Sequence, residues 1–160
     1  MKVKITKPPS SKSKTPQKIE VKVEKWDTWN MDWTIATIAH PMLIQLKETK
    51  HGAPMVDDDD VPDHLKSTAA EPKKLEHDID SNHFARWDYV LDEMIWAMYE
   101  IANYLPGEDA FFDHYEVNEN SCITEQVRQI KMDRDKLDTY RARLTNATSL
   151  FGKYFMNLWD

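Results

Sequence analysis

The stretch that decides the fold is Asn82–Leu105, NHFARWDYVLDEMIWAMYEIANYL. Its large apolar residues follow one another at steps of three and four: Phe84, Trp87, Leu91, Met94, Met98, Ile101 and Leu105. This spacing places them on one stripe of a helix and predicts an α-helix over 82–105. Three carboxylates lie beside the stripe, at Asp88, Asp92 and Glu93. They form either a solvated flank of a bundle helix or the floor of a site.

Two further segments have helical periodicity. The first face consists of Met31, Ile35, Ile38, Met42 and Leu46. It predicts a helix over about 31–50, with a kink or break near His40 because Pro41 removes a backbone donor. In the second segment an apolar residue recurs every seven positions: Ile123, Ile130, Leu137, Leu144, Phe151 and Leu158. This repeat predicts a long helix over 121–158.

These three principal helices predict an all-α fold, a helical bundle with antiparallel neighbours. Polar residues at heptad positions of the 121–158 helix leave room for a second chain, so a homodimer through this helix is expected. The chain has 160 residues, 41% of them apolar, which suits one domain with a sizeable core. The single Cys122 cannot form an intramolecular disulfide and favours a reducing compartment. No apolar run is long enough for a membrane span.

Residues outside these helices are polar. Positions 1–18 contain six Lys and no acid, which predicts a disordered basic arm, with 19–160 as a single helical domain. The arm is a solubilising tail or a contact for nucleic acid or an acidic partner, while the acidic remainder argues against duplex DNA as the main ligand. Residues 19–24 alternate and predict a short strand or extended coil. A long loop is predicted over 52–81, with a helical turn starting at Pro62, as a lid or binding loop.

Four segments of the chain form a distinctive set of motifs: WDTWNMD at 26–32, HPMLIQLKETKHGAPMVDDDDVP at 40–62, NHFARWDYVLDEMIWAM at 82–98 and FGKYFMNLWD at 151–160. In these segments the chain resembles a family of small proteins encoded by tailed bacteriophages. The likeness covers nearly everything after the basic arm. It implies production in the cytoplasm of an infected bacterium, with the virion as an alternative location. It implies no reaction, ligand or catalytic residue.

Acidic residues suggest a metal site. Asp88 and Asp92 are four residues apart on one helix face and, with Glu93, could hold Mg²⁺ or Mn²⁺ through oxygen ligands. Asp57 and Asp58 begin a run of four aspartates that repel one another unless they are solvated or neutralised by a cation. They are candidate ligands of the same kind of ion.

Cationic and aromatic residues suggest a recognition surface. His40, Lys47 and His51 follow helical spacing, and with Lys50 they form a cationic edge that could hold a phosphate or pair with the acids. Tryptophans cluster at the start of the first helix, where Trp29 and Trp33 form either an aromatic plug for the core or a ligand-stacking platform.

The sequence contains no complete catalytic set. The leading hypothesis is therefore an accessory protein that acts by binding a host or phage protein or a small nucleotide-like ligand, through the 52–81 loop and the cationic edge. An alternative is an Mg²⁺- or Mn²⁺-dependent enzyme like the all-α nucleotide pyrophosphohydrolases. In that enzyme the acids at 88, 92 and 93 would ligate metal and Lys47 and Lys50 would hold phosphates. A third alternative is a minor structural component of the virion.

Overall fold

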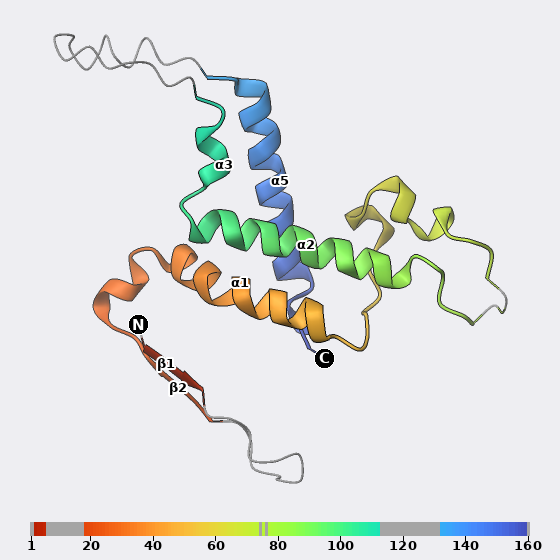
Figure 1. Cartoon of the computed structure of the whole chain (residues 1–160), viewed down its shortest axis with the longest axis horizontal. Coiled ribbons are helices and arrows are strands. Elements are labelled where there is room, and N and C mark those ends of the chain that lie inside the picture. Colours follow the sequence, from red (N-terminus) through yellow and green to blue (C-terminus); the bar gives the residue numbers. More distant parts are fainter. Residues whose placement is uncertain (1, 6–17, 74, 76, 113–131, 160) are drawn as a thin grey trace.

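The computed structural model describes residues 2–5, 18–73, 75, 77–112 and 132–159. The described part is mostly helical, which confirms the all-α class. Its long helices are α1 (Met31–Thr49), α2 (His83–Ala102) and α5 (Arg134–Lys153), as shown in Figure 1. None of the described helices has the length and apolarity that crossing a membrane requires.

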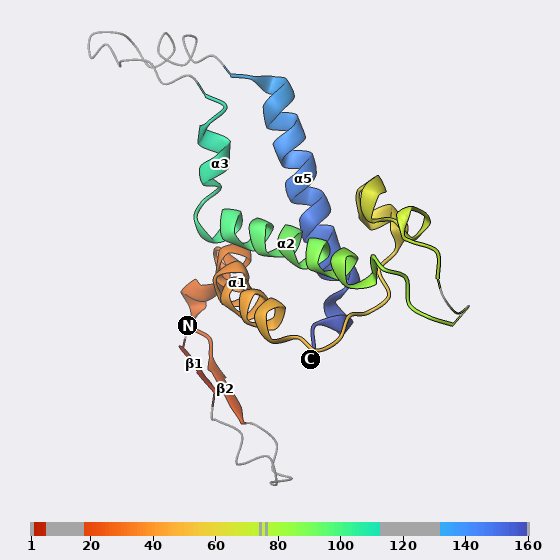
Figure 2. The same ribbon diagram turned by 45° about the vertical axis from the view of Figure 1, so that its right-hand side comes forward.

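Helix α2 is the middle element of the fold. Helix α1 runs alongside it in the opposite direction, while α5 crosses it instead of lying parallel (Figures 1 and 2). The predicted stripe on α2 is buried from Trp87 to Met98, but Phe84 is 47% exposed. The core joins α2 to its neighbours and to the following loop: Ala36, Leu43, Val56, Val61, Trp87, Val90, Leu91, Met94, Met98, Leu150 and Tyr154.

Helix α2 ends three residues before the predicted limit of 105. The Leu105 N–H donates to the Glu100 carbonyl at 2.7 Å and the Tyr104 N–H to the Ile101 carbonyl at 3.3 Å, the two bonds of a Schellman motif. Tyr104 therefore stands at the left-handed position that glycine usually occupies, with φ 61°, and Leu105 follows with φ 57°. Short helix α3 (Pro106–Asp109) then begins at Pro106, whose fixed φ suits a first helical turn.

A kink or a break was predicted near His40; helix α1 continues through Pro41, so the break does not occur. The proline removes the bond to the Thr37 carbonyl. Thr37 and Pro41 are both exposed, so water can take the place of the missing donor and the helix tolerates the loss. Helix α1 ends at Thr49, and Lys50 leaves helical geometry.

The last helix is shorter than the 121–158 prediction. Asp133 is its N-cap, and its carboxylate accepts from the Lys136 N–H at 3.2 Å. Met132 forms an isolated bridge with Phe112, so the chain is not helical there. At the other end Tyr154 caps α5 and a short 3₁₀ turn, η5 (Phe155–Asn157), follows. Positions 121–131 of the prediction, including Ile123 and Ile130, lie outside the described residues, and the homodimer through this helix stays a prediction.

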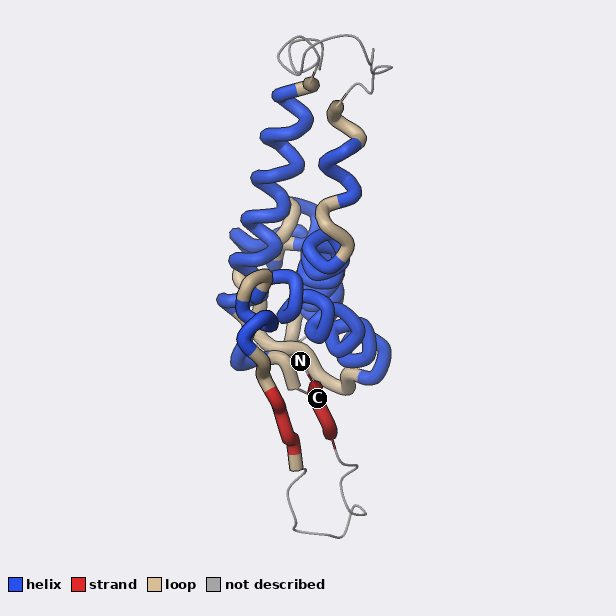
Figure 3. Tube along the Cα trace, turned by 90° about the vertical axis from the view of Figure 1, so that its left-hand side faces the viewer, coloured by secondary structure: helices blue, strands red, loops and turns tan. Residues whose placement is uncertain are grey.

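A two-stranded hairpin precedes the helices. Strand β2 (Ile19–Lys22) confirms the strand predicted within 19–24, and its antiparallel partner is β1 (Lys2–Ile5). The basic arm predicted over 1–18 thus contains a strand at its start, and its residues 6–17 lie outside the described part. The hairpin projects away from the helices (Figure 3) and reaches α1 through the turn η1 (Lys25–Thr28).

The predicted 52–81 loop contains three short 3₁₀ turns: η2 (Asp58–Asp60), η3 (Asp63–Leu65) and η4 (Ser67–Ala69). Pro62 immediately precedes η3, which confirms the predicted turn. A buried ion pair fastens the end of the loop to α2: Arg86 Nη1 and Nη2 donate to Asp80 Oδ1 and Oδ2 at 2.8 and 2.7 Å. Arg86 also donates to the Leu65 carbonyl at 3.3 Å, so one side chain holds two parts of the loop.

Replacing Asp80 should therefore destabilise the whole domain. Asp80→Ala leaves the Arg86 charge buried and unpaired, and we expect a loss of about 3–5 kcal/mol in the free energy of unfolding, measured by urea denaturation. The hydrogen bonds from Arg86 hold the pKa of Asp80 below its usual range. The stability that the pair contributes is therefore present above about pH 4 and lost as the pH falls through the lowered pKa. Asp63→Ala, which breaks an exposed pair with Lys66 in the same loop, is the control and should leave the midpoint unchanged.

Substitution of Tyr104 should reveal the strain at the end of α2. Both Tyr104→Gly and Tyr104→Ala lose the ring that stacks on Trp33 with centroids 6.0 Å apart. Glycine alone adopts a positive φ without strain. We therefore expect the glycine variant to be more stable than the alanine variant by about 1 kcal/mol in thermal or urea unfolding. Equal stabilities would contradict the left-handed conformation at this position.

Candidate protein-binding face

Four of the five acids predicted to bind metal, Asp57, Asp88, Asp92 and Glu93, are paired with a basic residue. Lys50 Nζ lies 2.6 Å from Asp88 Oδ1, and Lys47 Nζ lies 2.5 Å from Asp92 Oδ1. The cations predicted to hold a phosphate therefore neutralise the acids predicted to hold a metal. These contacts join α1 to α2. Across the ranges that the structure describes, no three His, Cys, Asp or Glu side chains are grouped where they could hold a metal ion.

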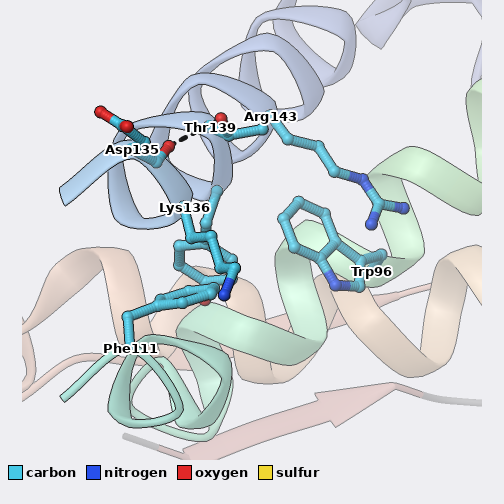
Figure 4. Close-up of a pocket in the computed structure, with 7 residues that line it drawn as sticks. Trp96, Phe111, Asp135, Lys136, Thr139 and Arg143 are labelled. Atoms are coloured by element: carbon cyan, nitrogen blue, oxygen red, sulfur yellow. Dashed lines mark hydrogen bonds between the residues drawn. The ribbon is translucent and has the colours of Figure 1, made fainter. Parts of the chain in front are cut away.

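Glu93 faces α5 and has a different partner. Arg143 Nε and Nη2 donate to its two carboxylate oxygens at 2.9 and 2.7 Å, and the Glu93 side chain is buried. The guanidinium also lies over the Trp96 ring, 4.0 Å from its centroid (Figure 4). The structure thus does not bring Glu93 together with Asp88 and Asp92 as a common site; Glu93 is part of the joint between α2 and α5.

The aspartates of the 52–81 loop dock on the end of α5. Lys153 Nζ lies 2.6 Å from Oδ2 of both Asp57 and Asp60. The Tyr154 hydroxyl donates to Asp60 Oδ2 at 2.5 Å and accepts from the Asp57 N–H at 3.0 Å. Burial, together with the bond to Asp60, raises the pKa of Tyr154 to about 12. Lys153 of α5 therefore offsets the charge of Asp57 and Asp60, whereas Lys47 and Lys50 of the cationic edge are paired with Asp92 and Asp88.

Asp58, the remaining candidate ligand in this run, points to another segment of the same loop. It accepts from the Ser67 N–H at 2.8 Å and from the Ser67 hydroxyl at 2.5 Å. These hydrogen bonds lower the pKa of Asp58. The carboxylate closes the loop between η2 and η4, which is a structural role.

The remaining predicted site residues do not form one surface. The Trp33 indole N–H donates to the Ala102 carbonyl at 2.9 Å and joins α1 to the end of α2, whereas Trp29 is 69% exposed and packs on Trp26. The predicted aromatic plug therefore includes Trp33 alone. The His40 ring lies 5.6 Å from that of Tyr99, and His51 is exposed beyond the end of α1.

The structure instead reveals a large apolar surface, which we call the α1 face. Its members lie on α1 and on the C-terminal segment and are 37–82% exposed: Met31, Ile35, Ile38, Met42, Phe155, Met156 and Trp159. Part of the face is a groove of about 680 Å³ between the two elements, lined by Ile35, Ile38, Ala39, Met42, Leu43, Leu46, Phe151, Phe155, Leu158 and Trp159. A groove walled by apolar side chains is suited to apolar side chains of a partner.

Helix α1 has apolar residues on two adjacent sides, about 100° apart around the helix axis. Ala36 and Leu43 are buried against the core, while Ile35 and Met42 point outward into the groove. The stretch 33–46, WTIATIAHPMLIQL, contains no Asp, Glu, Lys or Arg, and this was the sequence signal for the face. A surface helix is normally polar on its outer side, and a helix that is apolar all round is normally buried. Helix α1 has a polar side at exposed Thr37, Pro41 and Gln45, but its apolar surface extends beyond the side that the core buries and is available to a neighbour.

A second hollow, of about 440 Å³, lies between α2 and α5. Its lining is aromatic and charged: Trp96, Phe111, Asp135, Lys136, Thr139, Tyr140 and Arg143 (Figure 4). Its central polar groups already have partners, because Arg143 binds Glu93 and the Tyr140 hydroxyl donates to Glu100 at 2.6 Å. The hollow belongs to the joint between the helices, and the α1 face is the better candidate for a functional surface.

Comparison of the chain with protein-family models, curated proteins and solved structures finds no match.

The docking of the acidic loop on α5 predicts an alkaline transition. Tyr154→Phe removes a hydroxyl with two loop partners, and we expect it to lower the free energy of unfolding by about 1–3 kcal/mol at pH 7. Since folding raises the pKa of Tyr154, this contribution is complete below about pH 10 and is lost as the pH rises toward 12. The variant and the wild type should therefore converge at high pH in urea denaturation. Tyr99→Phe, at a half-exposed tyrosine of α2, should behave as wild type throughout.

Proposed function

We propose that this protein is a phage accessory protein that acts by binding an amphipathic α-helix of a partner protein along its α1 face. The proposal is based on two properties of α1: positions 33–46 contain no Asp, Glu, Lys or Arg, and the helix exposes apolar side chains in addition to those that the core buries. The resemblance to small proteins of tailed bacteriophages supports an intracellular role during infection. The proposal keeps the binding hypothesis drawn from the sequence but moves the recognition surface from the 52–81 loop to the α1 face.

The shape of the groove supports a helical partner. Its length follows α1 and its walls are Ile and Met side chains on one side and Phe155 and Trp159 on the other. Helix recognition commonly uses such a groove, into which one helix places apolar residues at i, i+3, i+4 and i+7. A volume of about 680 Å³ accommodates several large side chains of that kind. Met and aromatic residues are also those that interfaces favour.

The charge pattern separates this face from the rest of the surface. Lys47, Lys50 and Lys153 are paired with Asp92, Asp88 and Asp60, so these charges already neutralise one another within the fold. The nucleotide hydrolase alternative needs the same lysines free for phosphate and the acids free for metal. The observed pairs therefore favour the binding function, for which these side chains are not required.

Site-specific photo-cross-linking tests the proposal in bacteria that produce the full-length protein. A photoreactive phenylalanine analogue at Met42 or at Phe155, both in the groove, should give covalent protein adducts on irradiation. The same analogue at Ala142, an exposed position on α5, is the matched control and should give none. An absence of adducts at Met42 and Phe155, or equal yields at all three positions, would overturn the proposed binding role of the face.

A further inference from the structure

We infer that the partner at the α1 face is a second copy of this chain, with the two α1 helices packed antiparallel around a two-fold axis. The inference rests on the proposed function and names the helix that fills the groove. Three features of the described residues carry it: the area of the face, the spacing of its residues along α1, and the position of the hairpin.

The area of the face matches that of a stable dimer. A fully exposed large side chain presents about 100–250 Å², so the seven members of the face together expose on the order of 800 Å². The largest apolar patch on a monomeric protein is usually about 300–600 Å². A specific interface buries about 800 Å² on each partner. The α1 face is therefore larger than a monomer normally leaves open and has the size that one protomer contributes to a dimer.

The outward residues of α1 are spaced so that the helix can pair with itself. They are Met31, Ile35, Ile38 and Met42, with the half-buried Leu46 at the end of the row, and Ile38 is the middle member. A two-fold axis beside Ile38 places Ile35 of one copy near Met42 of the other. Such a contact is isologous, because the same patch serves both partners. The exposed acids of α1, Asp32 and Glu48, lie near the two ends of the helix, and an antiparallel arrangement about Ile38 does not place either acid opposite its own copy.

The groove gives each helix a second contact in the dimer. The partner's α1 would insert its Ile and Met side chains into the groove between α1 and the C-terminal segment, where Phe155 and Trp159 line the wall opposite α1. The same contact is repeated by symmetry in the other groove. Each α1 then has apolar neighbours on both of its apolar sides, which is the environment that its composition requires.

The hairpin extends on the side of α1 that faces away from α3 (Figures 1 and 3). All residues of β2 are exposed, and Ile19 and Val21 point to one side of the strand. A two-stranded hairpin without a supporting layer is only marginally stable in water. A second copy bound at the α1 face would lie beside this hairpin and could provide the missing layer.

Analytical ultracentrifugation of the purified full-length chain tests the inference. Between about 0.1 and 100 μM, the wild type should sediment as a dimer of 18.9 kDa chains. Ile38→Asp should raise the dissociation constant at least ~100-fold, because it places an unpaired charge at the axis. Ile79→Asp makes the same change at an exposed isoleucine outside the face and should leave the dimer intact. Circular dichroism establishes that both variants are folded.

Disulfide cross-linking supplies a second measurement that remains informative if Ile38→Asp does not fold. In a Cys122→Ser background, Ile38→Cys should give a disulfide-linked dimer on mild oxidation at low micromolar concentration, because the two residues meet at the axis. Ile79→Cys is the control and should stay monomeric.

A wild type that is monomeric throughout the concentration range would overturn the inference. So would a dimer that resists Ile38→Asp and fails to cross-link at position 38, since its interface would then lie elsewhere, for example along 121–158. Photo-adducts at Met42 with a protein other than a second copy would also overturn it while leaving the proposed function standing. Loss of photo-adducts altogether would remove the proposed function itself.

Discussion

Charged side chains buried along α2 determine how the other segments are arranged. Arg86, Glu93 and Glu100 are seven residues apart and therefore lie on one side of the helix. Each requires a partner from a different segment: Arg86 binds the loop before α2, Glu93 binds Arg143 of α5, and Glu100 accepts from Tyr140 of α5 and from the N–H of Gly107 in α3. An unpaired buried charge costs several kcal/mol, so few other arrangements of these segments are compatible with folding.

The helical periods were readable from the sequence, but the ends of the helices were not. The stripe on α2 follows from apolar spacing alone, because apolar residues that recur about every 3.6 positions lie on one side of an α-helix. Its end at Ala102 depends on a Schellman motif that places Tyr104 where glycine is usual, so no standard signal marks it. The seven-residue repeat of 121–158 continues through position 133 in the sequence with no change of period. It therefore did not reveal the N-cap at Asp133.

The candidate site was harder to predict, because its charges pair over long distances in the chain. Lys47 and Asp92 are 45 residues apart, and Arg143 and Glu93 are 50 apart. A local pattern shows that each of these groups is charged, but not which group neutralises it. The same acids therefore looked like metal ligands. The uncharged stretch of α1 was visible in the sequence, but only the position of α2 on one side showed that the other side is uncovered.

The absence of Asp, Glu, Lys and Arg from positions 33–46 of α1 has a thermal consequence. Association through apolar surface alone is driven mainly by water release near room temperature, and it carries a large negative change in heat capacity. Such a contact weakens on cooling and strengthens in sulfate or phosphate, whereas dilute salt, which screens ion pairs, hardly affects it. Cold storage would therefore loosen whatever covers the exposed apolar residues of α1 while leaving the ionic joints among the helices intact.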